Sequence, residues 1–336
     1  MSVKPLLSVV IPTKSRYPTL IPVLEAMLRT ISSRRIEFII NDNTPVNKDI
    51  LNWLDAHNDD RVRYFHHNEY LSMAQNFRGG LHHVKGEFVI VIGDDDVLHP
   101  EIIEILGAVV TDDVQCLSYD RGVYYWSGTE FAYQSRYMGP SKLLVKKNFT
   151  DDIGVIDAKE ALKNVCEAGM LNLGQLPNLY HGVVRSSLMR KILNHDPCIE
   201  PPDMGFAISI ALNVEKIHLI GLPLSVPGCS YNSAAGMGRR GEHRATLNDL
   251  PTWLPRDFAD LWSSDLPKVW NGYTFYNDCG LKILSHYESS LQINPSPMLV
   301  RTVMEKSNDI FLVIKAPGFV QLPVFKKVLV LAQGIF

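Results

Sequence analysis

The sequence lacks the features of several large protein classes. Its five cysteines are scattered and include no Cys-x-x-Cys pair, which argues against a disulfide framework and against a zinc site. No apolar run approaches the roughly 18 residues that a membrane span needs, and the first run, 6–11, is too short for a signal peptide. Lysine and arginine number 33 against 36 aspartates and glutamates, so no excess of positive charge favours nucleic acid. We therefore expect a cytoplasmic protein that binds no nucleic acid.

The first hundred residues do contain a regular alternation of short apolar runs and helical patterns. Residues 6–11, 36–40 and 88–92 are mostly apolar and rich in β-branched side chains, as buried strands are. Between them, apolar residues recur every three or four positions in 20–28 and 73–84, as in helices. Strands that alternate with helices indicate a mostly parallel sheet with helices on both faces. The predicted fold class is therefore α/β and Rossmann-like.

A polar cluster follows each of the three predicted strands, at 12–16, 41–43 and 93–96. In open parallel sheets, ligands bind beyond the carboxyl ends of the strands. We therefore expect the three clusters to contribute to one binding site.

The pattern becomes less regular after residue 114, and we predict two domains. The first covers 1–235 and contains the α/β sheet. The second covers 236–336 and consists of a flexible loop and a smaller, mostly helical region. The loop prediction rests on 225–244, which is rich in glycine, serine and arginine.

Three adjacent carboxylates, Asp94, Asp95 and Asp96, follow the third strand. Their mutual repulsion costs stability unless a cation is present. Hard cations such as Mg²⁺ and Mn²⁺ prefer oxygen ligands, usually one or two carboxylates together with phosphate oxygens. The alternative is an acidic turn that caps the helix expected after Pro100. The run therefore predicts a site for Mn²⁺ or Mg²⁺ or, on the other interpretation, a helix cap.

The three clusters belong to longer motifs that occur in a fixed order. The motifs are SVVIPTKSR at 8–16, EFIINDN at 37–43 and SMAQNFRGGLHHVKGEFVIVIGDDDVLHP at 72–100. Together they resemble the family 2 glycosyltransferases of the GT-A fold, as found in bacterial surface-polysaccharide synthesis. The resemblance covers about 5–235 and is most specific in the first hundred residues.

The resemblance implies a metal-dependent enzyme that moves a sugar from a nucleotide-sugar donor to a hydroxyl group of a glycan or lipid-linked acceptor. By resemblance, the donor is a UDP-sugar and the product has inverted anomeric configuration. Asp42 hydrogen-bonds the base in this family, and other positions contact the nucleoside or its phosphates. These are Pro12, Thr13, Ser15, Arg16, Asn76 and Arg78.

By the same resemblance, Asp95 is the direct metal ligand, Asp94 contacts the ribose or sugar, and Asp96 assists at the metal. Many members of the family carry an aspartate where this chain has Gly93. The choice among the three aspartates is therefore open by one position. The alternatives for Asp42 and Arg16 are a turn-forming side chain and a solvated surface charge.

Inverting transfer needs a general base that accepts the proton of the acceptor hydroxyl. In the family this is an acidic residue at the start of a later helix, and Asp203 is in the corresponding position, with Glu200 as the second candidate. The alternative is that Asp203 only caps its helix. The flexible loop contributes Arg239 and Arg240 as candidate pyrophosphate contacts.

His243 is a candidate metal ligand by resemblance, and the alternative is that 236–244 forms a basic hinge without a ligand. The apolar tail, 311–331, contains adjacent lysines, Lys326 and Lys327. Packing against the rest of the chain explains it most simply. The alternatives are contact with a second subunit in a homo-oligomer or with a membrane surface.

Two other functions compete with the transferase. A sugar-nucleotide pyrophosphorylase of the same architecture would need a glycine-rich basic loop after the first strand, where this chain has Thr13-Lys14-Ser15-Arg16. A non-catalytic carbohydrate- or nucleotide-binding protein would not need the acidic run, which is intact.

Overall fold

The computed structural model describes residues 4–133, 135–145 and 149–335. The chain forms two compact units whose segments interleave along the sequence. The first unit contains Met1–Ile156, Pro177–Asp196 and Lys216–Glu242. The second contains Asp157–Leu176, Pro197–Glu215 and His243–Phe336. Two segments that precede residue 235 therefore belong to the second unit. The sequence predicts a single boundary at residue 235, and that boundary stays a prediction.

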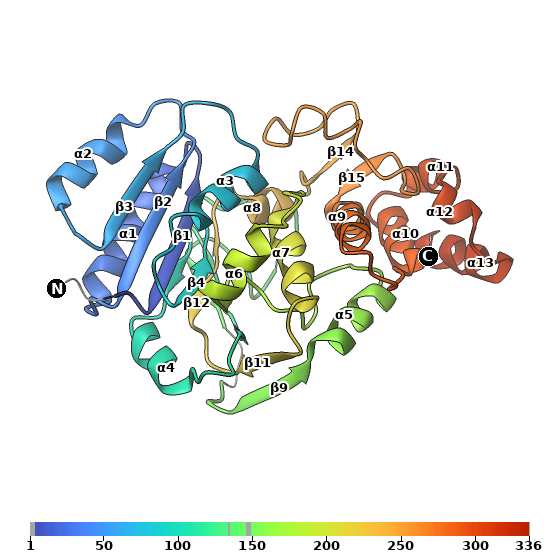
Figure 1. The fold of residues 1–336 in the computed structure, drawn as a ribbon. Coiled ribbons are helices and arrows are strands. Elements are labelled where there is room, and N and C mark those ends of the chain that lie inside the picture. The colour runs from blue at the N-terminus through green and yellow to red at the C-terminus, as the bar shows by residue number, and fades with distance from the viewer. Residues whose placement is uncertain (1–3, 134, 146–148, 336) are drawn as a thin grey trace. The chain divides into compact units, whose positions relative to one another are not determined.

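An eight-stranded sheet organises the first unit, with the order β3-β2-β1-β4-β10-β6-β11-β9 (Figure 1). The pairs β3–β2, β2–β1, β1–β4 and β6–β11 are parallel, whereas β10 is antiparallel to both of its neighbours. The strands are β1 (Leu7–Thr13), β2 (Ile36–Asp42), β3 (Val62–His66), β4 (Phe88–Val91), β6 (Cys116–Tyr119), β9 (Ile153–Asp157), β10 (Val183–Arg185) and β11 (Lys216–Ile220).

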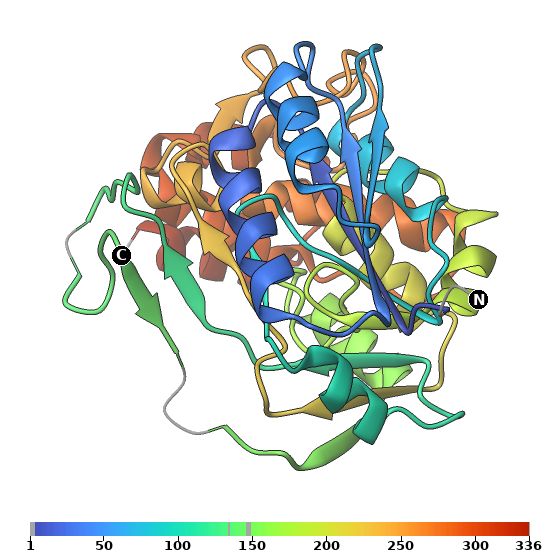
Figure 2. The same ribbon diagram turned by 90° about the vertical axis from the view of Figure 1, so that its left-hand side faces the viewer.

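Helices cover both faces of this sheet, and α1 (Tyr17–Thr30) lies on one of them (Figure 2). Alternate residues of a strand point to opposite faces, so Val9 and Ile11 of β1 join the core under α1, while Val10 faces α3 (Met73–Leu81). There Gly80 is required, because a Cβ on it would lie 2.4 Å from a Val10 methyl carbon. The other helices of the first unit are α2 (Lys48–His57), α4 (Ile102–Val109), α6 (Ser186–Leu193) and α8 (Ala234–Arg239).

Residues 225–244, predicted as a mobile loop, contain regular structure. Small sheets pair β5 (Val97–Leu98) with β12 (Ser225–Val226), and β7 (Val123–Tyr125) with β8 (Lys142–Leu144) and β13 (Gly228–Cys229). Helix α8 follows, and the Ser233 side chain caps it by accepting a hydrogen bond of 3.0 Å from the Gly236 amide. The composition misled the prediction because serine and glycine serve at helix starts as well as in loops.

The second unit is mostly helical and contains two hydrophobic clusters. One combines Leu162, Ile208 and Ile283 from three of its helices, and the other centres on the fully buried Trp270. Its elements are α5 (Ala158–Glu167), α7 (Pro202–Ala211), β14 (Arg244–Thr246), β15 (Val269–Asn271), α9 (Gly272–His286), α10 (Pro295–Glu305), η1 (Ser307–Asp309), α11 (Ile310–Val313), α12 (Pro317–Val320) and α13 (Val324–Ile335).

The predicted fold class, a mostly parallel α/β sheet with a smaller helical C-terminal region, is confirmed. Among the residues described, no helix combines the length and the apolar character that crossing a bilayer requires.

Candidate active site

The polar clusters after β1 and β4 meet, because the two strands are parallel neighbours and end at the same edge of the sheet. Thr13, the last residue of β1, donates a hydrogen bond of 2.7 Å from Oγ1 to Asp94 Oδ2. Arg16 donates from Nε to Asp94 Oδ1 at 2.5 Å. Both oxygens of Asp94 are therefore bound by the first cluster.

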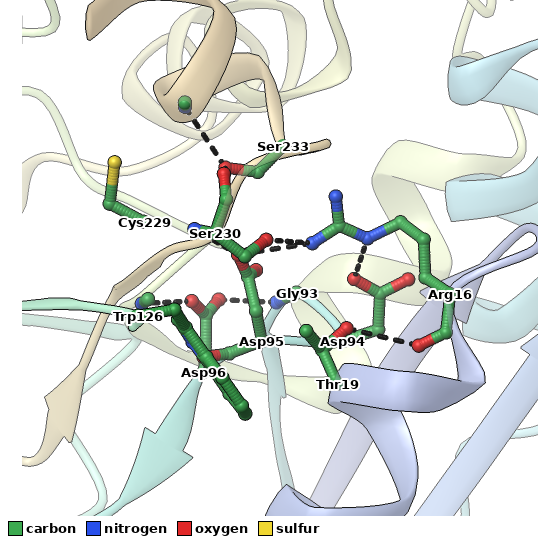
Figure 3. A network of polar contacts seen from close by, with 12 residues as sticks. Arg16, Thr19, Gly93, Asp94, Asp95, Asp96, Trp126, Cys229, Ser230 and Ser233 are labelled. Atoms are coloured by element: carbon green, nitrogen blue, oxygen red, sulfur yellow. Dashed lines mark hydrogen bonds and ion pairs between the residues drawn. The ribbon is translucent and has the colours of Figure 1, made fainter. Parts of the chain in front are cut away.

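Arg16 also reaches the second aspartate, as Figure 3 shows. Its Nη2 lies 3.0 Å from Asp95 Oδ2 and donates to Ser230 Oγ at 2.8 Å. Ser230 in turn donates to Asp95 Oδ2 from its amide at 3.0 Å and from its hydroxyl at 2.6 Å. One guanidinium thus lies between two carboxylates, and all three side chains are largely buried.

Asp96 is oriented differently and is enclosed by protein donors. Its Oδ1 accepts from the Gly228 amide at 2.6 Å, and its Oδ2 accepts from the Gly93 amide and from Tyr180 Oη at 3.1 Å. His181 Nε2 lies 2.9 Å from the same Oδ2. Since these groups surround a carboxylate that is 1% exposed, the geometry gives Asp96 the part of a structural anchor for the acidic turn.

The three aspartates differ in how readily they ionise. Burial raises the pKa of Asp94 to about 7 although Arg16 opposes the shift, and burial together with the Asp96 charge raises the pKa of Asp95. Burial alone would also raise the pKa of Asp96, but His181 and the hydrogen bonds lower it below its ordinary value. Two carboxylates in this turn therefore lack full charge compensation, even with Arg16 present.

The oxygen atoms of Asp94 and Asp95 fit a divalent cation. In the described part of the chain, no three histidine, cysteine, aspartate or glutamate side chains are gathered as a ready-made metal site. Mg²⁺ and Mn²⁺ do not need one when phosphate oxygens supply the remaining ligands. The position is also one that attracts positive charge, because the Arg16 guanidinium binds both carboxylates there.

Asp42 ends β2 and is fully buried, with hydrogen bonds on both oxygens. Tyr17 Oη and Tyr64 Oη donate to Oδ2 at 2.5 and 2.8 Å, and the Thr44 amide donates to Oδ1 at 2.8 Å. Burial and the hydrogen bond to Asp42 raise the pKa of Tyr17 to about 12. Both phenols therefore stay protonated and hold the carboxylate in place.

Asn76 and Arg78 lie on α3, close to the sheet but hydrogen-bonded to protein groups. Asn76 donates from Nδ2 to the Thr13 carbonyl at 3.1 Å, and its Oδ1 accepts from Asn41 Nδ2 at 2.7 Å. Arg78 donates from Nη2 to the Leu193 carbonyl at 3.2 Å. Asn76 thus fixes the end of β1, from which the nucleoside contacts are predicted to come.

The other residues predicted to wrap the nucleoside, Pro12 and Ser15, flank Thr13 in the same loop. Ser15 is exposed and has a φ of 58°, and its amide donates to Thr44 Oγ1 at 2.7 Å. The loop is therefore tied to the end of β2 as well as to the acidic turn.

The candidate base lies in the second unit. Asp203 is in the first turn of α7, where a helix N-terminus stabilises a carboxylate, and its Oδ2 accepts a hydrogen bond of 2.8 Å from Tyr276 Oη. The side chain is half-buried, whereas Glu200 is 3% exposed. Of the two candidates, Asp203 is the more accessible to an acceptor.

The basic residues near α8 make contacts within their own units. Arg239 lies over the Tyr125 ring, while Arg240 lies over Tyr231 and pairs with Glu242 at 2.6 Å. His243 begins the last segment of the second unit, where its ring packs against Trp270 with 4.5 Å between centroids. Burial lowers the pKa of His243, which favours the neutral ring.

Sequence reasoning missed the residues that surround the acidic turn from later segments. Ser230, Gly228 and His181 are separated from it by 85 residues or more, and no local pattern marks them. Gly228 admits no side chain, since a Cβ there would lie 1.9 Å from the Asp95 carbonyl oxygen. Gly93 is similarly confined, because a Cβ on it would lie 2.8 Å from Tyr180 Oη. In the sequence, only the glycine next to the aspartates, Gly93, could have indicated that other parts of the chain pack closely against the acidic turn.

Known proteins resemble parts of this chain in sequence and in fold. Residues 8–163 match the model of glycosyl transferase family 2. Two structures of S. aureus TarS 1–349 are similar to the chain. The complex with UDP-GlcNAc has a TM-score of 0.53 at 11% identity, and the match covers 98% of this chain and 80% of that TarS 1–349 chain. The other has a TM-score of 0.50 at 13% identity, with coverage of 97% and 88%. No curated protein matches the chain.

At such low identity, the likeness to TarS speaks for the fold alone. It covers 98% of this chain, and so includes both the mostly parallel sheet and the helical C-terminal region. The family match covers β1 to β9 and includes the acidic turn with its Thr13 and Arg16 contacts. Residues 8–163 therefore belong to glycosyl transferase family 2, and the chain is a glycosyltransferase with the GT-A fold.

Proposed function

We propose that the enzyme transfers a sugar from a UDP-sugar to a hydroxyl group of a glycan or lipid-linked acceptor, with inversion at the anomeric carbon, in surface polysaccharide or glycoconjugate synthesis inside the cell. The observation that carries the proposal is the pair Asp94 and Asp95 at the end of β4, held by one guanidinium. UDP-GlcNAc in the TarS complex supports a uridine nucleotide as donor. The inversion and the pathway rest on the family.

Asp94 and Asp95 are the residues that would hold Mn²⁺ or Mg²⁺, with diphosphate oxygens as further ligands. When bound, the metal would neutralise the charge that develops on the leaving nucleoside diphosphate. Because the Arg16 guanidinium occupies both carboxylates, it has to release at least one of them before the metal ion can bind there. Its guanidinium is then available to pair with the diphosphate. Asp96 keeps the turn in place through Gly228 and Gly93.

The remaining steps use the protein's own side chains. Asp42, fixed by Tyr17 and Tyr64, lies at the end of the strand next to β1 and is proposed to hydrogen-bond the base, as the family resemblance implies. Asp203 accepts the proton of the acceptor hydroxyl, and Tyr276 orients its carboxylate. Arg239 and Arg240 are proposed as pyrophosphate contacts once they leave their present aromatic neighbours.

Calorimetric titration of UDP, GDP, CDP and dTDP, with and without Mn²⁺, tests the donor and the metal together. We expect UDP to bind tightly only when Mn²⁺ is present, and Asp95→Asn to remove that binding. Asp112→Asn, which changes an exposed aspartate in the same unit, should bind as the unmodified protein does. Metal-independent binding of UDP, or equal binding by Asp95→Asn, would contradict the proposed metal site.

A further inference from the structure

The segment 310–335 exposes an unusual number of large apolar side chains. Among the described residues, nineteen such side chains are exposed, and six of them fall within these 26 positions. The helices that carry the segment, α11, α12 and α13, all pack against α10 and present their other sides outward (Figure 1). We call the six side chains the tail surface: Phe311, Ile314, Val320, Val324, Val328 and Leu329.

Packing in the core explains only part of α13. Val330 is fully buried and belongs to the cluster around Trp270. On the outward side, Val324 and Val328 are one helical turn apart and are 76% and 60% exposed. A surface helix of a soluble protein normally presents polar residues there. The outward side of α13 therefore has the composition of a buried face without a protein neighbour in the described chain.

The charge of this segment is of one sign. Residues 310–336 contain Lys315, Lys326 and Lys327 and no aspartate or glutamate. Because the whole chain carries −3, residues 1–309 carry −6 and the tail carries +3. The nearest acidic residues along the chain, Glu305 and Asp309, are both paired with Arg244. The segment that carries the tail surface therefore contains no acidic side chain to offset its lysines.

We propose that the tail surface binds the anionic surface of a lipid bilayer. Apolar side chains that enter the headgroup region and lysines that meet anionic headgroups are the two contributions that together give stable peripheral binding. The charge argues against a second copy of the chain as the partner, since a symmetric dimer through this surface would bring together two segments that each carry +3. The inference does not depend on the identity of donor or acceptor.

Sedimentation of the full chain with lipid vesicles tests the inference. We expect binding to vesicles of phosphatidylcholine with about 30% phosphatidylglycerol to be about a hundredfold tighter than to phosphatidylcholine alone, because each of the three lysines contributes a factor of roughly five. The difference should shrink as NaCl is added, since salt screens the lysines. Equal binding to both vesicle types, or none to either, would overturn the proposal.

Variants separate the two contributions. Val328→Glu should weaken binding to the anionic vesicles at least tenfold, while Leu261→Glu, at an apolar position that is 59% exposed elsewhere in the same unit, should leave it unchanged. Lys326→Gln with Lys327→Gln should reduce the preference for anionic lipid. Circular dichroism shows whether each variant folds. If light scattering instead finds a dimer that Val328→Glu dissociates, a second copy covers the surface and the lipid proposal is overturned.

Discussion

Replacing Arg16 by glutamine tests whether its guanidinium and a metal ion compete for the same carboxylates. Arg16 contacts Asp94 at 2.5 Å and Asp95 at 3.0 Å, and its side chain is only 16% exposed. Glutamine keeps a polar side chain but removes the positive charge. We expect Arg16→Gln to bind Mn²⁺ more tightly than the unmodified protein when no nucleotide is present.

The size of the effect follows from the contacts that the metal must break. A hydrogen bond to a charged group contributes about 1.5–3 kcal/mol. If the metal displaces one of the two contacts, the Arg16→Gln variant lacks that contact from the start. Mn²⁺ binding should then be roughly 10- to 100-fold tighter, since each 1.4 kcal/mol is about tenfold. Loss of Arg16 also leaves two buried carboxylates without their partner, which costs about 3–5 kcal/mol. Metal-free Arg16→Gln should therefore unfold at lower temperature and gain more from Mn²⁺.

Free Mn²⁺ measured by electron paramagnetic resonance gives the affinity, and thermal unfolding with and without Mn²⁺ gives the stabilisation. Arg16→Lys keeps the charge but cannot span both carboxylates, so its affinity should fall between the other two proteins. If Arg16→Gln binds Mn²⁺ no more tightly than the unmodified protein, while both bind it in the presence of UDP, the competition is refuted and the proposed metal site is not. If neither binds Mn²⁺ even with UDP, the proposed metal site itself fails.

Three further predictions concern packing, catalysis and thiol chemistry. Gly80→Ala should lower the free energy of unfolding by about 1–3 kcal/mol, because its Cβ has only 2.4 Å to the nearest side-chain atom; Gly107→Ala, in open space, should be neutral or stabilising in the same urea titration. Asp203→Asn should lower the rate of transfer by about 10²–10⁴-fold with the affinity for UDP unchanged, and a variant that keeps its rate would exclude this residue as the base. Cys198 is the one cysteine that is not buried, so a thiol reagent at pH 8 should modify it first. Burial raises the pKa of Cys166 to about 11, so about one Cys166 side chain in a thousand is a thiolate at pH 8. Its rate of modification should rise about tenfold per pH unit below that pKa. Rapid reaction of more than one thiol in the folded protein would contradict the burial of the other cysteines.

Much of the first unit was predictable because its strands are buried on both faces. Apolar runs such as 88–92 are read directly from the sequence, and parallel pairing places their carboxyl ends together. The interleaving of the two units was not predictable. The apolar faces of α5 and α7 show that each helix is buried, but not that Leu162 and Ile208 join a core with α9. The periodicity of apolar residues indicates which side of a helix is buried, but not which other elements it packs against.

Part of the candidate site, too, could be predicted from the sequence, and part of it could not. The sequence predicts that Thr13, Arg16 and Asp94 lie near one another, since all three lie at or just beyond the carboxyl ends of strands of one sheet. It did not distinguish Asp96 from its neighbours, because the difference comes from Gly228 and His181, far along the chain. The structure also accounts for the departure at Gly93, where an aspartate side chain would have to enter the space between Tyr180 and Asp96.

The later segments that enclose the acidic turn have a consequence for the order in which the enzyme is assembled. Strand β10 lies between β4 and β6, so the sheet remains interrupted until residues 183–185 have been synthesised. The Asp95 and Asp96 carboxylates lack Ser230 and Gly228 until residues 228–230 have been synthesised as well. A nascent chain that ends near residue 163 thus contains all the residues that match the family, but its sheet is interrupted and its acidic turn lacks the donors from later segments. The acidic turn therefore gains these hydrogen-bond donors only after residue 230 has been synthesised.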